Sequence, residues 1–225
     1  MTVQEIYNKI VWFVFGDSTP PGSVSSNLTG INGLIAQAHR DEMSDWNYWF
    51  MEVSAQFAFT AATNAYVLPS NFKQEISLSW QDADDASIIH DPLQRLAKGE
   101  LYTTFQDIDE ETDYPTHYSI YGGTGDGILY VWPVNNQDLT MVIQYYKFLD
   151  DLAAVGSTDK FTELGAYVLI YKVARDLCIN LDYGQKIRLF DGMYKDELSK
   201  LRSRDYRKKV GGINGGLHKI DYVGF

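Results

Sequence analysis

The sequence is poor in cysteine and in long apolar runs, and each absence excludes a class of protein. The single cysteine, Cys178, excludes an intramolecular disulfide, and its apolar helical surroundings predict a buried thiol. The longest apolar run near the start, Ile10 to Phe15, is far shorter than the ~20 residues that a membrane-spanning helix needs. No small-residue cleavage site follows a basic leader. We therefore expect a protein that is made in the cytosol and has no membrane partner.

Motifs for catalysis and for metal binding are also missing. The four histidines fall on separate predicted elements, and no histidine or cysteine spacing suits a transition metal. The glycine-rich stretch 122–127 leads into an apolar strand and not into a helix, so it predicts a hairpin loop instead of a phosphate loop. The acid-rich stretches 82–91 and 107–113 lack the ligand pattern of a calcium loop. We therefore expect no enzyme activity, with no catalytic residue, no cofactor and no metal.

What the sequence does contain is an uneven distribution of charge. The formal net charge is −11, yet residues 186–209 hold nine Lys or Arg against four acids, which leaves ten basic and twenty-six acidic residues elsewhere. This asymmetry fits electrostatic association between copies of an acidic protein, a nucleic-acid contact, or simply a solvated helix face. For association between copies, we assign Arg202, Arg204 and Arg207 as inter-subunit residues.

Hydrophobic spacing predicts four helices. Apolar residues recur at steps of three and four in the ranges 2–14, 32–64, 161–181 and 185–209. The aromatic cluster at 46–52, "WNYWFME", has this helical spacing and is interpreted as core, not as a ligand cage.

A β-rich region lies between the second and third helices. Alternating apolar and polar residues predict a half-buried strand at 72–80, and three further strands are expected at 116–122, 127–133 and 139–148. Short polar turns would join these three strands into an antiparallel meander, to which the first strand is added. The fold class is therefore α+β: a mainly helical bundle (1–71 and 150–210) with an inserted β meander (72–149).

The last fifteen residues, 211–225, predict an extended C-terminal arm. Five glycines prevent a regular helix, while the arm keeps several apolar side chains that need a surface to cover them. We assign these as partner-binding residues: Ile213, Leu217, Ile220, Tyr222, Val223 and Phe225.

Several stretches, in this order, resemble the head-to-tail adaptor (connector) proteins of tailed bacteriophages, of the short-tailed type. They are "INGLIAQAHRDEMSDWNYWFMEVSAQFAF" (31–59), "YVLPSNFKQ" (66–74), "YSIYGG" through "LYVWPVNN" and "MVIQYYKFL" (118–149), and the last two helices with the arm. The resemblance implies a structural virion protein of the neck or tail, which forms a homo-oligomeric ring of twelve copies. It also implies that the C-terminal arm docks on the portal protein, that a tail or nozzle protein follows, and that genomic DNA passes through the channel without sequence recognition, during packaging and ejection.

Two further interpretations remain open at this point. In the first, the β region is a monomeric sugar- or peptide-binding module, with Trp80, Trp132, Tyr121 and Tyr130 as a stacking platform. In the second, residues 186–209 bind DNA by sequence, although the rest of the acidic chain would repel phosphate. For the adaptor interpretation, we expect the acid-rich stretches 82–91 and 107–113 to line or rim the DNA channel.

Overall fold

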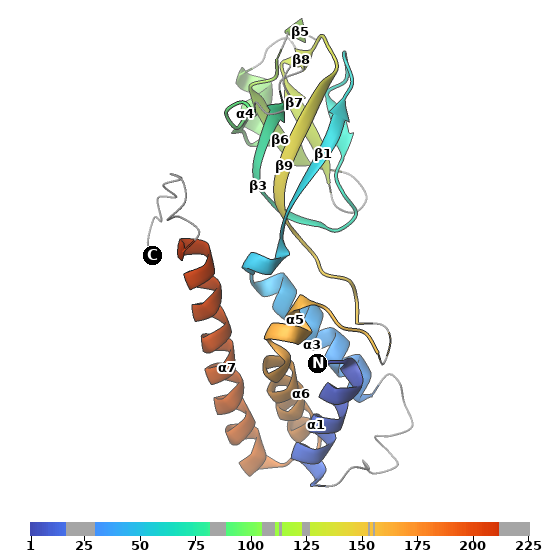
Figure 1. Ribbon diagram of the computed structural model, residues 1–225, viewed down its shortest axis with the longest axis vertical. Helices are drawn as coiled ribbons and strands as arrows, with labels where there is room; N and C mark the ends of the chain where they lie inside the picture. Colours follow the sequence, from blue (N-terminus) through green and yellow to red (C-terminus); the bar gives the residue numbers. More distant parts are fainter. Residues whose placement is uncertain are drawn as a thin grey trace. The chain divides into compact units, whose positions relative to one another are not determined.

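The computed structural model describes residues 1–16, 30–81, 89–104, 111–112, 114–122, 127–152, 154 and 156–211 (Figure 1). The chain divides into two compact units, a helical unit of residues 1–50 and 149–225 and a β unit of residues 51–148. Helices and antiparallel strands are both present and are largely separated between the two units, so the predicted α+β class is confirmed.

The helical unit is built around one buried helix. Its elements are α1 (Val3–Phe15), α3 (Ile31–Asp45), α5 (Lys160–Leu164), α6 (Ala166–Asn180) and α7 (Gly184–Gly211). Helix α6 packs against α1, α3 and α7, and it buries Cys178 completely, as the sequence predicts. Helix α1 begins with a capping box, in which Thr2 accepts a hydrogen bond from the backbone N–H of Glu5 and the Glu5 side chain accepts one from the backbone of Thr2.

The single helix predicted at 161–181 is interrupted at Gly165, which separates α5 from α6. Helix α7 passes so close to this point that a Cβ atom at residue 165 would lie 2.9 Å from Cδ2 of Leu201. The absence of a side chain at Gly165 therefore allows this close approach between two helices, a contact that the spacing of apolar residues along the chain does not reveal.

The prediction of one long helix over 32–64 is wrong in its second half. Helix α3 ends at Asp45, a short 3-10 turn follows at Trp49–Met51, and the chain then forms strands β1 (Glu52–Phe59) and β2 (Ala65–Val67). The segment "EVSAQFAF" satisfies both periods, because Val53 and Phe57 are spaced by four while Val53, Ala55, Phe57 and Phe59 alternate. Pairing with a strand that lies about eighty residues later in the chain decides in favour of β structure.

The described strands of the β unit form three small sheets, and not the single meander that the sequence predicts. Strands β3 (Phe72–Gln81) and β1 flank β9 (Leu139–Lys147), while β2, β7 (Ile128–Trp132), β6 (His117–Tyr121) and β4 (Gln94–Arg95) form a second sheet. A third sheet pairs β5 (Glu111–Thr112) with β8 (Val134–Asn135), and the short helix α4 (Lys98–Thr104) lies between β4 and β5 in the sequence. The expected β6–β7 hairpin is observed, but β9 pairs with β1 and β3 and not with β7.

The two larger sheets share one apolar core, which includes Phe59, Leu78, Leu129, Met141 and Ile143. Strict alternation along β3 predicts that Ile76 faces this core together with Leu78 and Trp80. Instead the β3–β9 register shifts between Glu75 and Ser77, and Ile76 is 42% exposed. An extra residue at such an irregularity reverses the facing of the side chains before it.

Candidate protein-binding surfaces

The C-terminal turns of α7 carry most of the uncompensated positive charge in the described part of the helical unit. In the middle of the helix, Lys195 pairs with Asp191 at 2.6 Å, and Lys200 pairs with Asp196 and Glu197 at 2.6 and 2.8 Å. From residue 201 to the end of the helix, five Lys or Arg face a single acid, Asp205. Cations at this end also suit the negative pole of the helix dipole.

Asp205 is buried and accepts hydrogen bonds within the helical unit, so it does not neutralise this exposed surface. It is 1% exposed, and its carboxylate accepts hydrogen bonds from Trp46 Nε1 at 2.8 Å and from the backbone N–H of Trp49 at 2.6 Å. Lys209 Nζ approaches the same carboxylate at 3.2 Å. Asp205 therefore fixes the last turns of α7 against the segment that follows α3.

The three arginines assigned from the sequence lie in different surroundings. The Arg202 guanidinium lies 4.7 Å from the centre of the Trp46 ring, so this side chain packs within its own subunit. The side chains of Arg204 and Arg207 are exposed and form no ion pair with any described residue; Arg207 Nε donates a hydrogen bond to the carbonyl oxygen of Ser203. Arg204 and Arg207 are thus available to a partner, while Arg202 has a structural contact.

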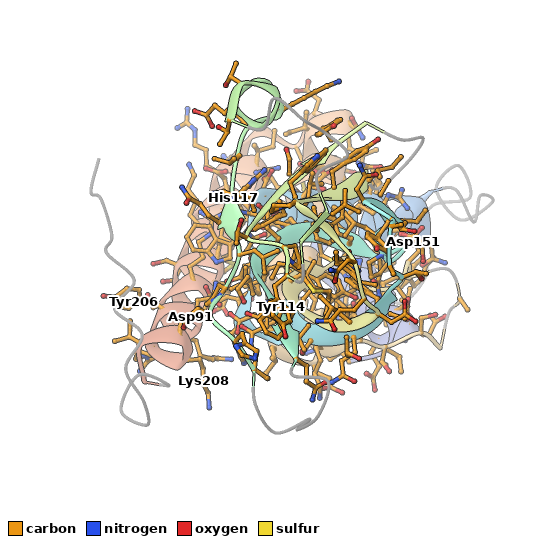
Figure 2. All side chains as sticks on the ribbon, turned by 90° about the horizontal axis from the view of Figure 1, so that it is seen from above. Asp91, Tyr114, His117, Asp151, Tyr206 and Lys208 are labelled. Carbon is orange, nitrogen blue, oxygen red and sulfur yellow. The ribbon has the colours of Figure 1, made fainter. Side chains whose placement is uncertain are left out.

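An open groove runs along this part of α7. It has a volume of about 620 Å³ and is lined by Trp46, Lys195, Leu198, Ser199, Arg202, Ser203, Tyr206 and Arg207. The Tyr206 side chain is 59% exposed and points outward from the last turns of the helix, as does Lys208 (Figure 2). Sequence spacing assigned Trp46 to the core, with the rest of the cluster at 46–52, and did not single out Tyr206, because an exposed aromatic residue has the same spacing as a buried one until the packing is known.

Two buried polar contacts hold the helices that present this surface. Glu42 on α3 is completely buried; it accepts a hydrogen bond from Tyr194 on α7 at 2.6 Å and pairs with Lys172 on α6 at 2.9 Å. Burial, together with the hydrogen bond to Glu42, raises the pKa of Tyr194 well above its usual range. The ion pair and the hydrogen bond of Glu42 therefore join α3 to both α6 and α7.

The second contact joins His39 on α3 to the start of α5. Asp159 caps α5 by accepting a hydrogen bond from the Thr162 backbone at 2.7 Å, and its other oxygen lies 2.6 Å from His39 Nε2. Burial opposes ionisation of Asp159, but the hydrogen bonds from His39 and Thr162 outweigh it and lower the pKa of the carboxyl.

The remaining histidines are not brought together with one another or with Cys178. His90 stacks on Trp80 with ring centres 3.4 Å apart, and His117 lies 2.7 Å from the hydroxyl of Thr116. Burial lowers the pKa of His117. His218 lies outside the described residues. Among the described side chains, no group of three His, Cys, Asp or Glu is placed to hold a metal ion.

The four aromatic residues proposed as a stacking platform do not form one. Trp132 is 2% exposed. The Trp80 ring stacks on the rings of His90 and Tyr114, with 3.4 and 4.2 Å between ring centres. Tyr121 and Tyr130 stack on each other at 4.3 Å, on the sheet that does not contain Trp80. A sugar or peptide would find only separate aromatic edges here.

The β unit carries nearly all of the net negative charge. Residues 51–148 hold fourteen acidic and four basic side chains, whereas the helical unit holds sixteen and fifteen, so the two units have net charges of −10 and −1. Much of the acid-rich sequence at 82–91 and 107–113 lies outside the described residues; Asp91, which is described, is exposed (Figure 2). The partner-binding residues assigned to the arm, 213–225, also lie outside the described part.

Comparison with models of protein families matches residues 1–214 to the family named SU10 adaptor protein. This match spans most of the chain, so the protein belongs to that family. The resemblance to phage head-to-tail adaptors is confirmed, which makes the chain a structural phage adaptor of the virion neck. No curated protein matches the sequence. Within the described residues, no helix is both long and apolar enough to span a membrane.

Proposed function

We propose that this SU10-type adaptor assembles into a ring that joins the portal vertex to the tail and continues the DNA channel. The observation that carries the proposal is the pair of exposed arginines at the cationic end of α7, Arg204 and Arg207, which form no ion pair with any described residue of their own chain. The same chain has a β unit with a net charge of −10. A basic end and an acidic unit on one molecule favour association of successive copies through unlike surfaces, and such head-to-tail contacts generate a ring when the rotation between copies closes.

In this ring, Arg204 and Arg207 of one copy meet acidic side chains of the next. Each exposed ion pair contributes only ~0 to 1 kcal/mol, so the contact also needs apolar burial and repetition around the ring. The groove beside α7 supplies the apolar part, because Trp46 and Tyr206 are 37% and 59% exposed. The resemblance to phage adaptors implies twelve copies.

The experiment is size-exclusion chromatography with light scattering, with and without portal protein. The variant Arg204→Glu/Arg207→Glu should lose ring formation while keeping its circular dichroism spectrum. A charge-matched control, Arg40→Glu/Arg188→Glu, changes two exposed arginines away from the last turns of α7 and should still assemble. Unchanged rings in the first variant would remove the proposed contact.

Arg202 needs a separate variant, because its guanidinium packs on Trp46. Cation–π contacts contribute ~0.5 to 2 kcal/mol, so Arg202→Glu is expected to lower the melting temperature as well as weaken assembly. An assembly defect in Arg202→Lys, with normal stability, would assign a direct inter-subunit role to this residue.

The arm at 211–225 supplies attachment to the portal in this proposal. Four buried apolar side chains at ~1.5 to 3 kcal/mol each give several kcal/mol per copy, part of which offsets ordering of the segment. Repetition around a ring then makes the attachment effectively irreversible.

Removal of residues 212–225 should leave far-UV circular dichroism and the melting temperature nearly unchanged and abolish co-purification with the portal. A truncated protein that unfolds would assign the arm to its own core. Retained portal binding would move the docking surface elsewhere, with the β6, β7 and β9 strands as the next region to test.

We further propose that acidic side chains from 82–91 and 107–113 line or rim the channel. A basic lining would hold the phosphates through counterion release, whereas an acidic one lets DNA slide. A structure of the assembled ring in which Lys and Arg dominate the channel wall would contradict this assignment.

A further inference from the structure

The two edges of the β1–β9–β3 sheet differ in their backbone hydrogen bonding. Residues 89–93 cover the outer edge of β3: the His90 backbone donates to Trp80 at 2.9 Å, and the Leu93 backbone donates to Leu78 at 2.7 Å. The opposite edge is the outer side of β1. Within the described chain, backbone hydrogen bonds join β1 to β9 and to no other strand.

Strand β1 is regular over its whole length. All eight residues pair with β9 in continuous antiparallel register, from Glu52 opposite Tyr146 to Phe59 opposite Leu139. Val53, Ala55 and Phe57 pack on the apolar core, and the alternate side chains are exposed. Because successive residues of a strand direct their backbone groups to opposite sides, about four N–H and four C=O groups point away from β9.

The usual protection against strand addition is missing from β1. Natural sheets shield long edges with lysine, proline, a bulge or a covering segment. Strand β3 has Lys73, two register shifts and the cover of residues 89–93. Strand β1 has no lysine, proline or bulge, no described segment is bonded to its outer edge, and its only charged residue is Glu52. Its edge therefore has the geometry and the sequence of a strand-accepting surface.

Charge decides which strand can be added. The β unit has a net charge of −10, so a β unit of a second copy would be repelled from this edge. The strongly basic part of the chain, 186–209, is almost entirely helix and cannot supply the strand.

We propose that the β1 edge accepts an extended segment of a separate protein, one that carries Lys or Arg and adds as a further strand next to β1. Main-chain hydrogen bonds provide the affinity, and the acidic unit selects the partner by charge. The proposal rests on β1 and its sheet alone, and it holds whether or not the copies form a ring.

The test uses residue-resolved amide hydrogen exchange on the full chain at low concentration. Alternate amides of β1 should exchange rapidly in the free protein, while those of β9 are protected on both sides. A blocked synthetic peptide of alternating Lys and Val, at ~1 mM to detect weak binding, should slow the rapid set by about tenfold or more. The counterpart of alternating Glu and Val should have no effect.

Two double variants separate the edge from the face of the same sheet. Ser54→Lys/Gln56→Lys places two charges on the exposed side of β1 and should abolish the peptide effect. Thr140→Lys/Gln144→Lys adds the same charge to exposed positions of the central strand β9, where Gln144 lies opposite Ser54, and should keep it.

Four outcomes would overturn the proposal. The first is full protection of β1 in the dilute free chain, which would mean that its own chain covers the edge. The second is protection that rises with protein concentration, which would identify a second copy as the occupant. The third is that both peptides slow exchange of the β1 amides equally, or that neither peptide slows it at ~1 mM. The fourth is an undiminished effect in Ser54→Lys/Gln56→Lys.

Discussion

The helical unit and the β unit of this adaptor bury polar groups in different ways. The buried polar residues of the helical unit include His39, Glu42 and Asp205, which are ionisable and are held by partners on other elements. Those of the β unit are uncharged, namely Ser79, Ser119 and Asn135, and its core is a continuous apolar cluster. The comparison shows that one chain uses directional charged contacts to fix helices and apolar packing to fix sheets.

The difference has a functional consequence. Helices can slide or rotate against one another with little change in apolar burial, whereas a buried ion pair is satisfied in only one arrangement. Glu42 and Asp205 therefore hold α7, and with it Arg204 and Arg207, in one orientation. In the β unit the backbone ladder itself sets the register of the strands.

The largest expected effect comes from breaking the buried ion pair. Glu42→Ala leaves the largely buried Lys172 with only Asp41, at 3.5 Å, and removes the acceptor of the Tyr194 hydroxyl, so it should cost ~3 to 5 kcal/mol of stability. Hydrogen exchange should show the loss in α3, α6 and α7 and not in the β sheets. The surface control is Glu163→Ala, which removes an exposed pair with Lys160 and should cost ~0 to 1 kcal/mol. Equal losses in the two variants would contradict the comparison.

The matching change in the β unit is Leu129→Ala. This side chain is fully buried in the apolar cluster, so the cavity should cost ~2 to 4 kcal/mol. The loss should be confined to the amides of residues 51–148, as measured by hydrogen exchange under increasing urea. If the helical amides lose the same protection, the two units unfold together. The two units would then differ in how they bury polar groups but would not be stable independently of each other.

The contact of Asp159 with His39 predicts a pH dependence of smaller size. Because the pKa of Asp159 is lower in the folded protein, its stabilisation is complete above the unfolded value of about 4 and is lost as the pH falls through the folded value. Asp159→Asn keeps a good N-cap residue. It should cost ~1 to 2 kcal/mol at pH 7 and reduce the fall in stability below about pH 4.

Urea unfolding monitored by far-UV circular dichroism at several pH values measures this effect. Asp150→Asn changes an exposed acid of the same unit and should leave the pH profile as it is. If the free energy of unfolding falls equally steeply at acid pH in Asp159→Asn and in the unchanged protein, other carboxylates cause this loss of stability.

The smallest expected effect is the loss of the N-terminal cap. Thr2→Ala removes the side-chain acceptor for the Glu5 N–H and should cost ~1 kcal/mol, seen as faster exchange in the first turn of α1. Thr2→Ser retains the hydroxyl and should restore most of the protection. If Thr2→Ser behaves like Thr2→Ala, the methyl group and not the hydrogen bond is responsible.

Local sequence signals were sufficient where one period or one composition dominated. The helices at 3–15 and 184–211, the strand at 72–81, the burial of Cys178 and the basic character of the last helix all follow from residues that are neighbours in the chain. The residues that carry the family resemblance are likewise visible in the sequence, and so are the acidic and basic regions on which the proposed assembly depends.

Tertiary structure decided the features in which distant residues meet. The segment 52–59 fits two periods and becomes a strand because β9 pairs with it, and the side chain of Leu201 lies against Gly165, where the helix is interrupted. Nothing in the local sequence separates Arg202, which packs on Trp46, from the exposed Arg204 and Arg207. The open edge of β1 could be recognised only once its pairing was known, because an edge is a property of a sheet and not of a strand.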